Sequence, residues 1–143
     1  MQKDIRHTWF FEHAPEKVWE YITDAALVAQ WLMPNDMLPV VGHKFTFTTK
    51  PLPHMNFDGI AHCEILIATP PKLFAYSWKG GPGNGEISLD SVVTWELTPK
   101  ENGTELVLLH SGFTDENEII FTAMNEGWGK HIKTRLFDLI NAK

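Results

Sequence analysis

Hydrophobic and polar residues follow two different periods along this chain. Between residues 42 and 113 they alternate with a period close to two, which is typical of strands that turn one face toward a core. Clusters of proline and glycine separate the alternating runs. The pattern predicts five strands joined by short turns, an antiparallel meander. Its two middle strands cover Phe57 to Ala68 and Leu73 to Trp78, where the alternation is less regular.

Helical periods appear on both sides of this meander. A first strand, Ile5 to Phe11, is followed by a helix with Pro15 in its first turn, and Asp24 can cap a second short helix that Pro34 ends. After the meander, hydrophobic residues from Phe121 to Leu139 recur at steps of three or four, which predicts a long amphipathic helix.

The order of these elements predicts an α+β fold in one domain covering residues 1–143. It consists of a curved six-stranded antiparallel sheet, two short helices between strands one and two, and a long C-terminal helix across the concave face. One long helix cannot fill such a hollow, so we expect a cavity or groove between helix and sheet.

Several short motifs occur in an order and spacing that resemble a known family. They are Ala14-Pro15-Glu16-Lys17-Val18-Trp19, Thr23-Asp24 with Gln30-Trp31, Pro70-Pro71-Lys72-Leu73 with Tyr76-Ser77-Trp78, Val93-Thr94-Trp95-Glu96-Leu97, Gly103-Thr104-Glu105-Leu106 with His110-Ser111-Gly112-Phe113, and Gly127-Trp128. The chain resembles the helix-grip (START-like, SRPBCC) superfamily, and within it most closely the family homologous to the activator of heat-shock protein 90 ATPase. Residues 41–44, Val-Gly-His-Lys, depart from the paired glycines that this family often has before the second strand.

The resemblance implies a fold and a cavity, and it assigns no catalytic residue. Similar proteins look like carriers of apolar molecules, cyclases or hydrolases that use the same cavity, or modules that bind a chaperone. We therefore expect a ligand-binding protein, with a chaperone-binding module as the alternative and an enzyme as a third class.

Composition and charge limit the classes of molecule that this protein is expected to bind. The 143 residues carry 12 Lys and Arg against 18 Asp and Glu, a formal net charge of −6, which disfavours nucleic acid and anionic membranes. The single Cys63 excludes an intramolecular disulfide, and the seven histidines form no metal-binding motif. The chain begins without the apolar core of a signal peptide and has no run long enough to span a bilayer. We expect a cytoplasmic protein without metal or cofactor.

Aromatic and sulfur-containing side chains are the candidate lining of the cavity. Six tryptophans are many for this length, and most of the candidates fall at inward positions of different elements. The alternative is that each ring is simply core. The candidate ligand-binding residues are Trp31, Met33, Phe45, Phe47, Tyr76, Trp78, Trp95, His110, Met124, Trp128 and Ile132.

Three further features carry hypotheses. His110 shares an inward strand face, where it is either a general base paired with a carboxylate or, as we expect, a hydrogen-bonded core histidine. Gly127 and Gly129 flank Trp128, and we expect them to permit a close approach to the sheet or a bend, unless the helix starts later. The segment from Trp31 to Leu52 has the Met, Pro and Gly content of a mobile lid.

Overall fold

The computed structural model describes residues 3–55, 57–83 and 85–142, and it has the predicted order of elements. The strands are β1 (Lys3–Phe11), β2 (Lys44–Thr48), β3 (Ile60–Thr69), β4 (Leu73–Gly80), β5 (Leu89–Lys100) and β6 (Gly103–Phe113). The helices are α1 (Pro15–Thr23), α2 (Ala25–Trp31), α3 (Glu118–Lys130) and α4 (Phe137–Ile140), with 3-10 turns η1 (Pro53–Met55) and η2 (Asp115–Asn117) and a π-helical segment η3 (His131–Leu136). Within the described residues, no helix is long and apolar enough to cross a membrane.

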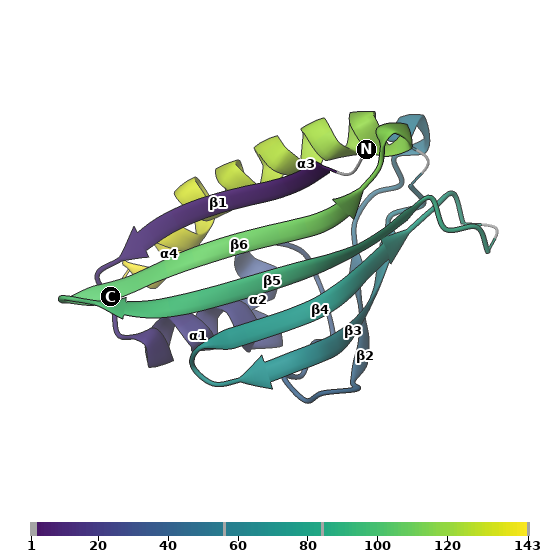
Figure 1. Ribbon diagram of the computed structural model, residues 1–143. Helices are drawn as coiled ribbons and strands as arrows, with labels where there is room; N and C mark the ends of the chain where they lie inside the picture. Colours follow the sequence, from purple (N-terminus) through teal and green to yellow (C-terminus); the bar gives the residue numbers. More distant parts are fainter. Residues whose placement is uncertain (1–2, 56, 84, 143) are drawn as a thin grey trace.

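The six strands form one antiparallel sheet in the order β1-β6-β5-β4-β3-β2. The predicted meander is therefore confirmed, with β1 added beside β6. Figure 1 shows the curved sheet with the long C-terminal helix lying along it, and α1 and α2 gathered at the end where α4 also lies. This is the predicted α+β, helix-grip architecture.

Two short helices form for the reasons that the sequence gives. Pro15 occupies the first turn of α1, and Val18, Trp19 and Ile22 form its buried face. The Asp24 carboxylate then accepts a hydrogen bond from the Leu27 amide at 3.1 Å, so it caps α2 as expected.

The start of β3 differs from the prediction. Phe57 does not continue this strand, because it forms an isolated bridge with Leu52, in which the Leu52 amide donates to the Phe57 carbonyl at 2.7 Å. Gly59 follows with a φ of 94°, a backbone conformation that interrupts a strand, and β3 begins at Ile60. The turn that ends at Gly59 therefore sets the start of β3, although the alternation of side chains predicted an earlier start.

The C-terminal helix packs against the sheet unevenly. Trp128, Ile132, Leu136 and Ile140 are all buried and follow one another at steps of four. Repeated steps of four exceed the α-helical period of 3.6, and the wider π-helical segment keeps these residues on one face. In contrast, Ile120, Ala123 and Met124 in the first half of α3 are only partly buried. The helix is thus buried more completely from Trp128 onward than in its first half, where Phe121 nevertheless contacts Phe113 of β6 with ring centroids 5.2 Å apart.

The two glycines of α3 do not serve a close approach to the sheet, so this part of the expectation is wrong, whereas the bend stays a prediction. A Cβ atom at Gly127 would approach His131 Cδ2 only to 4.0 Å, and one at Gly129 would approach His7 Cε1 to 3.7 Å, both ordinary contacts. The alternative of a late helix start is also wrong, because α3 begins at Glu118.

We therefore predict that Gly129→Ala stabilises the protein. Alanine in a helix interior is favoured over glycine by ~1 kcal/mol, and the added methyl group meets no obstacle. Urea denaturation checks this. Gly112→Ala is the contrasting variant: its φ is 110° and its Cβ would lie 2.8 Å from the Asp90 carbonyl oxygen, so it destabilises. A Gly129→Ala protein less stable than the parent would contradict the prediction.

Candidate functional site

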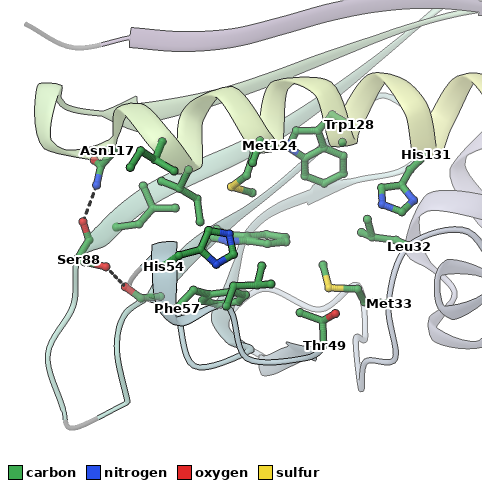
Figure 2. A pocket seen from close by; sticks show the side chains of 18 of the residues that line it. Leu32, Met33, Thr49, His54, Phe57, Ser88, Asn117, Met124, Trp128 and His131 are labelled. Carbon is green, nitrogen blue, oxygen red and sulfur yellow. Dashed lines mark hydrogen bonds between the residues drawn. The ribbon is translucent and has the colours of Figure 1, made fainter.

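A pocket of about 270 Å³ lies between the first half of α3 and the elements that face it. The helix provides one wall, formed by Ile119, Ile120, Ala123, Met124, Gly127 and Trp128, with His131 of η3 next to them. These residues recur at helical spacing, so they lie on one side of the helix. Figure 2 shows Met124, Trp128 and His131 pointing from the helix toward Leu32, Met33 and Thr49 opposite.

The facing wall comes from three separate segments. They are the end of α2 with Leu32 and Met33, the connection from β2 to β3 with Thr49, Leu52, His54 and Phe57, and the β4–β5 region with Trp78, Gly80, Ser88 and Leu89. Apolar side chains predominate among these residues. The wall is therefore suited to an apolar molecule held by shape and ring contacts.

The mouth of the pocket opens to solvent near the start of α3. Glu116 and His54 are exposed, and Ile119, although apolar, is 63% exposed at the rim. Asn117 is buried nearby and ties α3 to the β4–β5 connection, since its Nδ2 donates to the Ser88 carbonyl at 2.7 Å (Figure 2). Its Oδ1 accepts from the Thr114 amide at 2.9 Å. The bond to Ser88 attaches the start of α3 to the β4–β5 connection at the rim.

Two tryptophans that line the pocket, Trp128 and Trp78, are linked by a chain of buried hydrogen bonds. Trp128 Nε1–H donates to His110 Nδ1 at 3.0 Å, so the ring proton of a neutral His110 is on Nε2. Nε2–H donates to Ser91 Oγ, 2.8 Å away, and the Ser91 hydroxyl donates to the Trp78 carbonyl at 2.8 Å. All the polar atoms in this chain are partnered, as burial requires.

His110 is therefore a hydrogen-bonded core residue. It is fully buried, it does not line the pocket, and its two partners are Trp128 and Ser91 rather than a carboxylate. Burial lowers its pKa to about 3. A ring that stays neutral and has both nitrogens engaged is poorly suited to general-base chemistry.

The structure separates the eleven candidate residues into two groups. Met33, Trp78, Met124 and Trp128 line the pocket. The other seven are buried in the interior and do not line the pocket: Trp31, Phe45, Phe47, Tyr76, Trp95, His110 and Ile132. The rings form a continuous cluster in which Trp95 contacts both Trp31 and Trp128 edge-on, with centroids 6.2 and 5.5 Å apart.

Most residues of the facing wall were not among the predicted ligand-binding residues. His54 and Phe57 reach the pocket because η1 and the Leu52–Phe57 bridge fold the β2–β3 connection back under α3, and no period in the sequence indicates this. His131 follows Trp128 at a step of three, a helical spacing that would have placed it on the same side. Of the expected lid, residues 31–52, only Leu32, Met33, Thr49 and Leu52 line the pocket.

Carboxylates of the neighbouring strands and of α3 do not line the mouth of the pocket. Glu64, Asp90, Glu96 and Glu126 lie elsewhere, whereas Glu116 is the carboxylate at the rim. Among the described residues, no group of three or more His, Cys, Asp or Glu side chains could hold a metal ion.

Comparison with known families gives a match over residues 12–141 to the model of Activator of Hsp90 ATPase homolog 1-like proteins. The chain belongs to this family. The expected resemblance is thus confirmed, over nearly the whole chain. No protein of curated function matches the chain in sequence.

Solved structures agree with this membership. Protein MLL2253 from Mesorhizobium loti is 30% identical with a TM-score of 0.88, over 99% of this chain and 98% of that one. BH1534 from Bacillus halodurans is 23% identical with a TM-score of 0.77, over 97% of each chain. The Aha1 dimer from Colwellia psychrerythraea is 18% identical with a TM-score of 0.77, over 96% of each chain, and like BH1534 it is similar in fold alone.

The pKa of His110 makes the stability of this family member depend on pH. In the unfolded chain a histidine binds a proton below about 6.5, whereas folded His110 does so only near 3. Between these values the unfolded state holds more protons, so the free energy of unfolding falls as the pH falls. From about pH 7 to about pH 5 the loss from this residue is about 2 kcal/mol.

His110→Gln tests this, because an amide retains a donor and an acceptor but does not titrate. We predict that the difference in unfolding free energy between the parent protein and this variant shrinks by about 2 kcal/mol on going from about pH 7 to about pH 5. All other titrating groups cancel in the difference. Urea denaturation measures both free energies. If the parent and the variant show the same dependence on pH, the pKa of His110 is not lowered in the folded protein and the prediction is contradicted.

Proposed function

We propose that this domain binds a small, largely apolar molecule in the pocket between α3 and the sheet. The observation that supports it most strongly is the uneven packing of the C-terminal helix, which leaves Ile120, Ala123 and Met124 facing an open volume rather than the core. A volume of about 270 Å³ exceeds the ~150 Å³ at which an apolar engineered cavity in another protein accepts benzene. A bicyclic aromatic compound is of suitable size.

The lining suits such a ligand in shape and in chemistry. Trp128 and Trp78 offer ring faces and edges, and their own centroids lie 5.9 Å apart in an edge-on arrangement. Met33 and Met124 lie on opposite walls, and their flexible thioethers adapt to ligands of different outline. Removal of about 300 Å² of apolar surface from water, at ~25 cal/mol per Å², is sufficient for micromolar affinity.

Filling the pocket tests this proposal. Ala123→Phe places a ring in the pocket from the helix wall, at a cost in helix propensity of about 0.5 kcal/mol. Because this ring occupies volume that the ligand needs, we expect the affinity for 2-naphthol to fall by about tenfold or more. Ala26→Leu, on the exposed side of α2, is the control and binds like the parent. Affinities come from NMR titration. If 2-naphthol does not bind the parent, or binds both variants equally well, the proposal fails.

A second candidate function is protein binding, as the description of the family suggests. Leu38, Val40 and Val41 are 54–62% exposed, in a loop that the Gly42 amide joins to the Ile65 carbonyl of β3 at 2.9 Å. Leu66 and Ile67 are also exposed on that strand. Because this hydrogen bond joins the two segments, we infer that the five residues form one apolar patch, a feature that marks interaction surfaces. The patch is separate from the residues that line the pocket.

The patch and the pocket can be tested separately. If the domain binds an Hsp90 ATPase through the patch, Val40→Glu with Val41→Glu lowers its affinity for that protein by about tenfold or more and leaves the binding of 2-naphthol unchanged. Sedimentation or surface plasmon resonance with a purified Hsp90 ATPase measures the first affinity. Equal affinities for parent and variant would exclude the patch as the binding surface.

A further inference from the structure

A contact between Phe57 and Gly80 forms part of the pocket wall that faces α3. Both residues line the pocket, and Figure 2 shows the Phe57 side chain on the side opposite the helix. A Cβ atom at Gly80 would lie only 3.2 Å from Cδ1 and from Cε1 of Phe57. One edge of the ring therefore rests on the Gly80 backbone, in space where any other residue would place its side chain.

This contact accounts for the glycine at position 80. Gly80 is the last residue of β4, it is buried, and its φ is not positive, so its backbone conformation does not require glycine. Glycine weakens a strand, and its presence there often marks a place where another group approaches closely. Here that group is the ring of Phe57.

The backbone on both sides holds Phe57 in this position. The Leu52 amide donates to the Phe57 carbonyl at 2.7 Å, and the Phe57 amide donates to the Leu52 carbonyl at 3.3 Å. The amide of the next residue, Asp58, donates to the Gly81 carbonyl at 2.8 Å, directly after the end of β4. The ring is thus placed against β4 before any ligand binds, which lowers the entropy lost on binding.

The ring of Phe57 also offers free surface to a ligand. Phe57 is only partly buried, whereas Trp78 and Trp128 are 4% and 2% exposed. Its side chain is a large apolar group at the border of the open volume, and it occupies about the space of one further ring of an aromatic ligand. The size of the pocket on this side therefore depends on Phe57.

We propose that Phe57 limits the size of the ligand that the pocket accepts, and that Gly80 is the positioning residue that keeps the Phe57 ring in the wall. This inference rests on the proposed ligand-binding function and deepens it, because it assigns the residue that determines specificity. With Phe57 in place the pocket suits a bicyclic body. Without the ring it suits a body that is larger by one ring.

Two probes that differ by one ring, 2-naphthol and 9-phenanthrol, test this proposal with the full chain. We expect Phe57→Ala to shift the ratio of their dissociation constants toward 9-phenanthrol by about tenfold or more, because the larger probe gains the vacated space and the smaller one loses a ring contact. NMR titration gives both constants. A loss of stability does not change this ratio, because an unfolded fraction raises both apparent constants by the same factor.

Phe137→Ala is the matched control for the loss of a ring. Phe137 is also partly buried, it stacks on Phe11 with ring centroids 4.3 Å apart, and it does not line the pocket. We expect this variant to leave the ratio unchanged. Circular dichroism checks that both variants fold.

Gly80→Ala tests the positioning of the ring. With Phe57 present, the added methyl group displaces the ring, and we expect the affinity for 2-naphthol to fall by about threefold or more. In the Phe57→Ala background the methyl group meets no ring, and the affinity changes by about twofold at most.

The outcomes separate the inference from the proposed function. A ratio that Phe57→Ala does not change, or that Phe137→Ala changes equally, overturns the assignment of Phe57. Equal effects of Gly80→Ala in both backgrounds overturn the assignment of Gly80. Each of these results leaves the proposed function intact as long as 2-naphthol binds the parent. If neither probe binds the parent, the proposed function itself fails.

Discussion

The buried chain of hydrogen bonds from Trp128 through His110 and Ser91 to the Trp78 carbonyl fixes the C-terminal helix to the middle of the sheet. It joins three elements, α3, β6 and β5, to the backbone of a fourth, β4. Each bond is buried, so breaking one leaves another buried polar atom unpaired. The position and rotation of the helix at Trp128 are therefore strongly restrained.

The two halves of the helix differ because of this fixed point. Beyond Trp128 the buried residues continue through Ile132, Leu136 and Ile140, and the end of α2 packs beside them. Before Trp128, the helix borders the mouth of the pocket. There the Asn117 side chain attaches the start of α3 to the β4–β5 connection. The pocket is the volume between these two attachments. Trp128 also lines the pocket, so the residue that anchors the helix contacts whatever occupies the pocket.

Much of the fold could be predicted from the sequence because it depends on periods and turns. The meander, the cap at Asp24 and the long helix each follow from local patterns, and the family resemblance set their arrangement. The site was less accessible. Phe45, Phe47 and Tyr76 have the same inward period as Trp78. Which ring lines the pocket and which is core depends on its position along the strand as well as on the strand, because Tyr76 and Trp78 are both in β4. The facing wall depends on η1 and the Leu52–Phe57 bridge, which bring residues together without a repeating pattern.

The most direct test of the account is a map of intermolecular NOEs between 2-naphthol and the methyl groups of the protein. The account predicts contacts with Ile120, Ala123, Met124 and Met33, and none with Leu136 or Ile140, which are buried in the core. Contacts restricted to Val40, Val41 and Leu66, or no contacts at saturating probe, would contradict a ligand pocket beneath the first half of α3.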